Sequence, residues 1–265
     1  MTNPGTVITL TPEETAKAEL LEAIENEPAV ERESQSSVIV RMIEETFNLF
    51  HDHNKDVFAQ DKATSEVFAI NSRSFKDCIV ARFYDATKKA VRDQSLREAL
   101  TTVSGMGRHS GELRTVNIRT AHHGGTYCLD LCIPGNSAAV IVKPGKWLTL
   151  DKPESLFIRP ESMQPLPVPV PGASLELLWS ICNIPQSQRL LVATWLIECL
   201  RPETPFPILE LIGEQGSAKS TTQRNLRRVI DPNACDLRAA PKCVDDIFVS
   251  AGVCAVVSYE NLSHL

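Results

Sequence analysis

Three features that would place the chain outside the cytoplasm are missing from its 265 residues. No apolar run approaches the roughly 18 residues that a membrane-spanning helix needs. The N-terminal residues lack the basic and apolar regions of a secretory signal. The eight cysteines are scattered rather than spaced as a disulfide framework, so we expect reduced thiols. These absences predict a cytoplasmic protein that does not contact a membrane.

The chain also lacks a uniform excess of positive charge, which argues against a protein covered by nucleic acid. Its formal net charge is −6, and the first 34 residues hold eight Glu against two basic residues. From Arg73 to Arg119 the balance reverses, with ten Lys or Arg against five Asp or Glu. Such a segment can bind DNA, whereas the interspersed acids favour an ordinary solvated helix face. Both interpretations stay open.

Residues 1–36 predict an acidic helix, at about 11–28, followed by a polar linker. Residues 37–158 change between a helical period and a period of two, which is typical of an α+β domain. Glycines at 105 and 107 are expected to end the last helix of this part. The expected helices lie at 37–50, 75–86 and 95–103, the hairpin at 56–70, and the strands at 113–121, 126–133, 138–142 and 147–150.

Five prolines within residues 159–172 predict an extended, semi-rigid connector, and we place a domain boundary there. Beyond it, residues 173–265 begin with two helices, expected at 175–182 and 186–200. Alternating strands and helices follow, which predicts a parallel sheet covered on both faces. The alternating series is expected as strand 207–212, helix 219–229, strand 236–238, helix 241–250 and strand 253–259.

The chemistry-bearing motif is Gly213-Glu-Gln-Gly-Ser-Ala-Lys-Ser220, which we call the candidate loop. It lies between an expected strand and an expected helix, where consecutive backbone N–H groups and the positive helix end can bind a triphosphate. In this interpretation Lys219 reaches the β- and γ-phosphates and the Ser220 hydroxyl ligates Mg²⁺. The residues expected to line the phosphates are Gly213, Gly216, Ser217, Ala218, Lys219, Ser220 and Thr221.

Ala218 departs from the usual pattern, which has glycine before the lysine. A Cβ at this position restricts the backbone. The loop nevertheless resembles that of minichromosome-maintenance helicases, which have alanine there, so the substitution is expected to be tolerated.

A second motif, Val253-Cys-Ala-Val-Val-Ser-Tyr-Glu260-Asn261, follows about 40 residues after the loop. It is an apolar run that ends in an acid. In P-loop ATPases an acid at this place holds Mg²⁺ and helps to orient the attacking nucleophile. Glu260 is therefore the candidate metal-side carboxylate, and Asn261 a candidate for orienting water.

Together the two motifs resemble the ATP-binding proteins of phages and integrative elements, which are related to superfamily 3 and poxvirus-type primase-helicase ATPases. Asn48-Leu-Phe-His-Asp and the connector motif Phe157-Ile-Arg-Pro are similar as well, so the resemblance covers most of the chain after about residue 36. It implies a P-loop NTPase domain that binds ATP and Mg²⁺ and serves DNA replication of a mobile element. It also implies a homo-oligomer for the complete protein.

Two departures from these relatives matter. Their second motif commonly has Asp before the Asn, whereas this chain has Glu260, which has a longer side chain. They also place a further strand with a γ-phosphate sensor, and then an arginine finger, where this sequence stops. We therefore expect an incomplete parallel sheet in a truncated chain, and doubtful hydrolysis by this chain alone. The alternatives are a non-catalytic remnant whose N-terminal domain binds DNA or a replication partner, and a small-molecule P-loop kinase.

Overall fold

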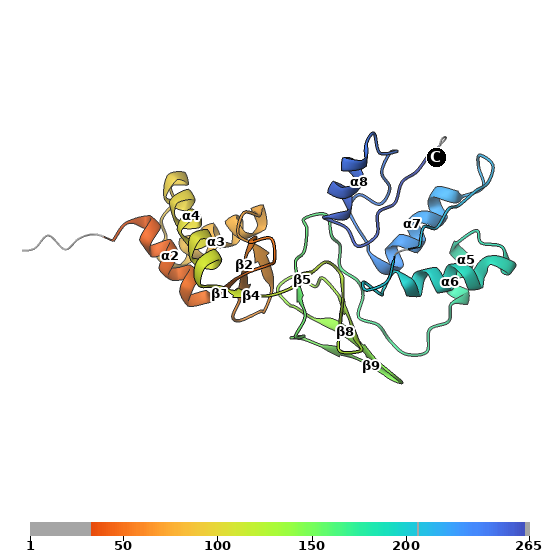
Figure 1. Ribbon diagram of the computed structural model, residues 1–265, viewed down its shortest axis with the longest axis horizontal. Coiled ribbons are helices and arrows are strands. Elements are labelled where there is room, and N and C mark those ends of the chain that lie inside the picture. Colours follow the sequence, from red (N-terminus) through yellow and green to blue (C-terminus); the bar gives the residue numbers. More distant parts are fainter. Residues whose placement is uncertain (1–32, 206, 263–265) are drawn as a thin grey trace, which may run out of the picture.

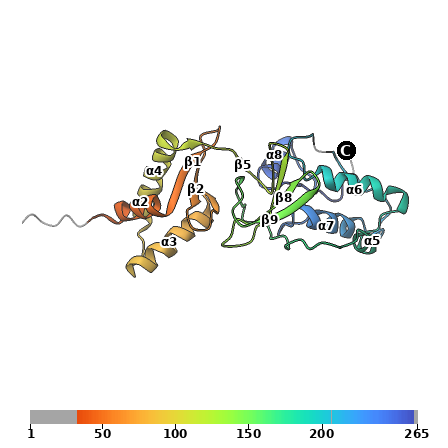
Figure 2. The same cartoon turned by 90° about the horizontal axis from the view of Figure 1, so that it is seen from below.

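The computed structural model describes residues 33–205 and 207–262, so the acidic helix expected at 11–28 lies outside the described residues. Figure 1 shows an elongated molecule with one helical unit at each end and a small sheet between them. Figure 2, seen from below, shows the same order. Within the described ranges, no helix is both long enough and apolar enough to cross a bilayer.

The N-terminal unit packs three helices against one sheet. The sheet has the strand order β3-β2-β1-β4, with β1–β2 and β2–β3 antiparallel and β1–β4 parallel. Its core combines apolar residues of the helices with residues of β1 and β2. The elements are α2 (Gln35–Thr46), β1 (Phe47–His51), β2 (Val57–Asp61), β3 (Val67–Ala69), α3 (Arg73–Thr87), α4 (Asp93–Ser110) and β4 (Glu112–Leu113).

The helix predicted at 37–50 is wrong in its last turn. The α2 helix ends at Thr46, and Phe47 begins a strand whose residues pair with β2 over five positions. Phe47 and Phe50 are both buried. Pairing with β2 and burial of these rings outweigh the helical spacing of the local sequence, which is a weak determinant against tertiary contacts.

The prediction that Gly105 and Gly107 end a helix is also wrong, because α4 continues through both to Ser110. Gly107 instead allows close packing. A Cβ built on it would lie 2.3 Å from Cγ1 of Val57 in β2, whereas a Cβ on Gly105 meets nothing within 4 Å. The hairpin predicted at 56–70 is confirmed as β2–β3.

The middle of the chain forms an antiparallel meander with the strand order β6-β7-β8-β9. The strand predicted at 113–121 is divided, because its residues contribute to three different sheets. A two-stranded parallel sheet joins β5 and β10. The elements here are β5 (Val116–Asn117), β6 (Thr120–His123), β7 (Thr126–Asp130), β8 (Ala139–Lys143), β9 (Lys146–Leu150) and β10 (Leu156–Phe157).

The proline-rich connector is anchored along its first half. The Leu166 amide donates to the Leu131 carbonyl at 2.9 Å, and Leu166 is buried against the meander. Met163 forms an isolated antiparallel bridge with Asn233. Val168 and Val170 farther along are exposed. The connector therefore fixes the meander to the C-terminal part.

In the C-terminal part the predicted helices form, but the predicted strands do not form ladders. Among the described residues of this part, the pairing is limited to isolated bridges, including the parallel bridge between Arg238 and Tyr259. Leu209 and Leu211 still pack on the core formed by the helices. The elements are α5 (Glu176–Ile181), the 3₁₀ helix η1 (Gln186–Gln188), α6 (Arg189–Glu198), α7 (Lys219–Ile230) and α8 (Val244–Ala251).

Candidate nucleotide-binding site

The candidate loop leads directly into α7 through two residues in the left-handed region. Gly216 has φ 85° and Ala218 has φ 59°. Ala218 is the N-cap of α7, and its carbonyl accepts the Thr222 amide at 2.9 Å. A residue with a Cβ in this conformation costs about 1–2 kcal/mol. The position at which the sequence departs from glycine is thus one that glycine would suit better.

Gly213 is required by a close approach within the loop. A Cβ at Gly213 would lie 2.9 Å from the Ser217 hydroxyl and 3.8 Å from Cδ of Lys219. The Ser217 hydroxyl donates to the Glu214 carbonyl at 2.8 Å. Glycine at 213 therefore lets the loop close on itself.

The Lys219 side chain turns back over the loop. Its Nζ donates to the carbonyls of Gly213 and Glu214, both at 2.6 Å, and lies 3.4 Å from the Ser217 hydroxyl. The ammonium group thus lies against the loop that precedes α7, and the first N–H groups of α7 have no intrahelical partner. An anion there would meet both the lysine and the helix end.

Asn183, in the turn between α5 and η1, supports the loop from outside. Its side-chain amide donates to the Ser217 carbonyl at 2.9 Å, and its backbone N–H donates to the Thr222 hydroxyl at 2.9 Å. Thr222 is buried, so its hydroxyl belongs to this support. Motif spacing could not reveal Asn183, because it lies about 30 residues before the loop.

The acidic motif lies beside the same helix. The Gln223 side-chain amide donates to the Tyr259 carbonyl at 2.8 Å. Gln223 follows Lys219 by four residues and Ser220 by three, spacings that share one helix face. The structure thus brings the segment that ends in Glu260 to the face of α7 that carries the two predicted phosphate and metal residues.

Asp231, the C-cap of α7, fixes the rest of that segment. One carboxylate oxygen accepts the backbone amides of Ala255 and Val256 at 3.0 and 3.2 Å. The other accepts Nε of Arg119, from the meander, at 3.0 Å, and both side chains of this ion pair are fully buried. Asp231 therefore joins the helix, the acidic segment and the meander.

The remaining predicted residues differ in their exposure to solvent. Ser220 and Glu260 are half-buried, whereas Thr221 and Asn261 are exposed. Asn261 adopts φ 56°, a conformation that Asn tolerates better than most residues. The Glu260 amide donates to the Arg238 carbonyl at 2.9 Å. Hydrogen bonding to the Cys254 thiol raises the pKa of Arg238, so this guanidinium beside the acidic motif stays charged.

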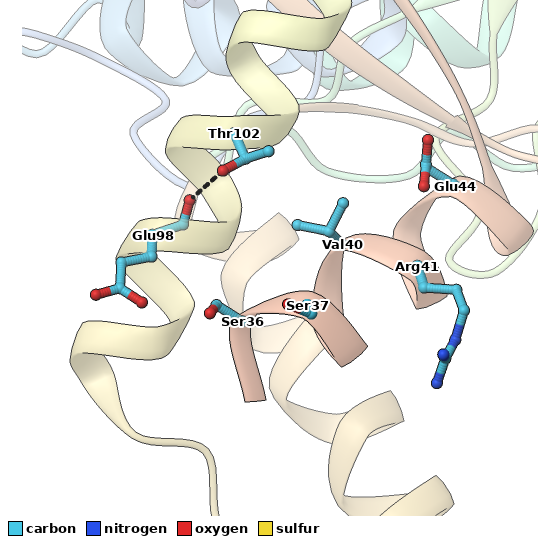
Figure 3. Close-up of a pocket in the computed structure, with 7 residues that line it drawn as sticks. All are labelled: Ser36, Ser37, Val40, Arg41, Glu44, Glu98 and Thr102. Carbon is cyan, nitrogen blue, oxygen red and sulfur yellow. Dashed lines mark hydrogen bonds between the residues drawn. The ribbon is translucent and has the colours of Figure 1, made fainter. Parts of the chain in front are cut away.

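The basic segment and the hollow between α2 and α4 are less suited to binding an anion than the candidate loop is. Half of the ten basic residues from Arg73 to Arg119 form ion pairs with carboxylates. The hollow in Figure 3 lies between α2 and α4, far from the candidate loop in sequence, and Arg41 at its edge pairs with Glu33. The dashed bond in Figure 3, from the Thr102 hydroxyl to the Glu98 carbonyl, stays within α4.

Comparison with known proteins gives one family match. Residues 175–265 match the model of the actinomycete integrative conjugative element replication protein. No curated protein and no solved structure gives a significant match. The matched segment begins next to α5 and contains the candidate loop, Asn183, Asp231 and the acidic motif. The match supports a protein that serves replication of a mobile element.

Proposed function

We propose that the C-terminal part is a P-loop NTPase unit that binds Mg-ATP and serves DNA replication of a mobile element as a helicase-related ATPase. The observation that carries this proposal is the position of Lys219. Its ammonium group is held over a closed loop at the N-terminal end of α7, although no carboxylate pairs with it among the described residues. A triphosphate would replace the two contacts of the ammonium group with neutral carbonyls by ion pairs with anionic phosphate oxygens, which are stronger.

The acidic motif supplies the metal side of this proposal. The Ser220 hydroxyl and the Glu260 carboxylate are oxygen donors of the kind that Mg²⁺ prefers. The hydrogen bond from Gln223 to the carbonyl of Tyr259, the residue before Glu260, supports their proximity. The residues that are present therefore fit Mg²⁺ bound together with a nucleotide, with Glu260 acting through a water molecule.

The test is equilibrium binding of a fluorescent ATP analogue in the presence of Mg²⁺. Lys219→Ala should weaken binding by roughly 10-fold to 100-fold, because it removes a hydrogen bond from a charged group. Lys242→Ala is the matched control, since Lys242 is an exposed lysine of the same part of the chain and lies outside both motifs. Removing Mg²⁺ should weaken binding to the wild type more than to Glu260→Gln.

Equal binding by Lys219→Ala and Lys242→Ala would exclude the candidate loop as the nucleotide site. Absence of binding by a folded wild-type chain would favour a non-catalytic protein that acts through its N-terminal parts.

A further inference from the structure

One edge of the meander is β9, the last strand in the order β6-β7-β8-β9. All five residues of β9 pair with β8 on one side, and among the described residues no strand pairs with its other side. Proteins usually shorten, cover or interrupt such an edge, because its unpaired backbone groups can bind another strand. Between Lys146 and Leu150 there is neither a proline nor a bulge. The sequence of β9 therefore contains nothing that prevents a further strand from pairing.

The other edge strands of the described ranges are shorter. β3, β4, β5 and β10 have only two or three residues each. β6 has four, and the Glu203 carboxylate approaches it from outside the meander, 3.8 Å from Nδ1 of His122. By contrast, Trp147 and Leu150 of β9 are 43% and 42% exposed. In Figure 1 the β8–β9 hairpin reaches the lower edge of the molecule, away from the helices at either end, so its edge is accessible.

The β8–β9 hairpin fixes which backbone groups of β9 point outward. Its loop has two residues, and the pair that closes it is Lys143 with Lys146. The closing pair of such a hairpin exchanges its backbone hydrogen bonds, and along antiparallel strands pairs of this kind alternate with pairs that do not. The N–H and C=O groups of Trp147 and Thr149 therefore point away from β8. In the part of the chain that the structure describes, no hydrogen bond from another element reaches them.

These outward groups are complementary to those of a second β9. When two β9 strands pair antiparallel about a two-fold axis at Leu148, Trp147 of one copy lies opposite Thr149 of the other. Each of these two pairs can then exchange both of its outward hydrogen bonds. The same axis places Leu148 opposite itself and Lys146 opposite Leu150. All five residues of each strand are thus paired.

The charges favour this register over its neighbours. With the axis at Leu148 no two like charges are opposed, and Asp151, which follows β9, falls beside Lys146 of the second copy. Opposite charges on neighbouring strands stabilise a pair, whereas like charges directly opposite destabilise it. An axis one residue later would oppose Lys146 to Lys152. An axis one residue earlier would leave part of each strand unpaired.

Leu148 also ends an apolar row on one face of the meander. Cys128, Ile141 and Leu148 are direct cross-strand neighbours, and the first two are buried in a core cluster with Phe157. Leu148, at the open edge, is 37% exposed. Pairing about Leu148 continues the row into the same residues of the second copy. Because apolar neighbours on one face stabilise antiparallel strands, the pairing covers surface that a single copy leaves open.

We propose that β9 is a self-association edge, through which two copies of the chain form a symmetric dimer paired antiparallel about Leu148. The two meanders then form one continuous sheet. The partner is a second copy because the outward hydrogen-bonding groups, the charges and the apolar row are all complementary to themselves in one register. The pairing uses no residue of the candidate loop or of the acidic motif, so it goes beyond the proposed nucleotide binding.

The test is sedimentation equilibrium of the full chain up to about 100 µM, because a short interface binds weakly. The wild type should show a reversible equilibrium between monomer and dimer. Leu148→Lys and Leu148→Glu should each weaken self-association by roughly 10-fold or more, because each variant opposes two like charges across the axis. An equimolar mixture of the two variants should restore the dimer, since the opposed charges then attract each other.

Leu113→Lys and Leu113→Glu are the matched controls. Leu113 is an exposed leucine on β4, which is an edge strand of the N-terminal sheet. These variants introduce the same charges at an edge that the proposal does not use, so they should self-associate as the wild type does.

A cysteine at the axis measures the register directly. Leu148→Cys places two thiols on residues directly opposite each other, with Cα atoms about 4.5 Å apart, which is within the range for a disulfide. Leu150→Cys is the control, because the two copies of this position lie about 13 Å apart along the strands in the proposed register. Under mild oxidation only Leu148→Cys should form disulfide-linked dimers above the level of the wild type, whose Cys235 and Cys243 are exposed.

Four outcomes would overturn the proposal. They are a wild type that stays monomeric over the whole concentration range, equal effects at Leu113 and Leu148, a mixture of the Lys and Glu variants that does not form dimers, and equal cross-linking by the two cysteine variants. Because these assays contain no nucleotide, their results are independent of the test at Lys219.

Discussion

The N-terminal unit and the C-terminal part are held together in different ways. In the N-terminal unit, β1 and β2 pair at five positions, and aromatic rings such as Phe47 and Phe75 contact each other at the centre. In the C-terminal part the helices share an apolar core, but the segments beside α7 are fixed by side-chain contacts to the backbone. Ladders of backbone hydrogen bonds fix the strands of the N-terminal unit, whereas single polar side chains fix the segments beside α7.

The difference shows in what each region leaves exposed. Ile208 and Ile212, on either side of the half-buried Leu209 and Leu211, are 95% and 86% exposed. Phe248 and Val249 of α8 are exposed as well. The candidate loop keeps its shape beside this open apolar surface because Asn183, Gln223 and Asp231 hold its surroundings individually. Each of these three side chains should therefore carry an unusually large share of local stability.

The largest effect is expected at Asp231. Asp231→Ala would leave the Arg119 guanidinium buried without its carboxylate and would remove the acceptor of two backbone amides. Breaking a buried pair in this way costs about 3–5 kcal/mol. The free energy of unfolding from urea titration checks this value.

Asp236→Ala is the control, because Asp236 pairs with Arg228 at the surface, where such pairs contribute about 0–1 kcal/mol. If the two variants lose equal stability, the C-terminal part does not depend on its buried side-chain contacts, and the comparison between the regions fails.

A smaller effect on stability is expected in the N-terminal unit, where the packing of α4 against β2 determines the effect of each substitution. Gly107→Ala should destabilise by about 1–3 kcal/mol, since its Cβ would collide with Val57. Gly105→Ala, in the same helix, meets open space and should stabilise by about 0.5–1 kcal/mol. Thermal unfolding of the two variants gives the comparison directly.

Adding Val57→Ala to Gly107→Ala tests the cause. The double variant should recover part of the loss if the collision is responsible, because the two changes then interact rather than add. Strict additivity would mean that Gly107 acts through something other than its approach to Val57.

The smallest effect is expected in the candidate loop. Ala218→Gly should stabilise the chain by about 1 kcal/mol, because φ 59° strains alanine and suits glycine. Ala240→Gly is the control, at an exposed alanine without positive φ, and should be neutral or slightly destabilising. A loss of stability at Ala218 would show that its Cβ contributes contacts that outweigh the backbone strain.

Local patterns were sufficient for several elements of the fold. Apolar spacing and flanking Gly or Pro predicted the hairpin of β2 and β3, the meander and helices α3 and α7. The motif spacing also placed Lys219 and Ser220 in the first turn of a helix. These features depend on interactions between near neighbours, which a short stretch of sequence contains.

Other features were outside the reach of local patterns. The strand at Phe47 and the helix through Gly107 depend on β2, whose residues lie 10 or more positions away along the chain. The predicted strands beside α7 have only isolated bridges in the described residues, because a ladder requires a partner at the right distance and direction.

The sequence by itself determined the local chemistry of this protein: a glycine-containing loop, a lysine and a serine at the start of a helix, and an acid at the end of an apolar run. Tertiary structure decided which of these meet. Gln223 brings the acidic motif to α7, and Asp231 ties both to the meander through Arg119. The physical reason is that a buried charge needs a partner close to it in space, and that partner can lie far away along the chain, as the separation of 112 residues between Arg119 and Asp231 shows.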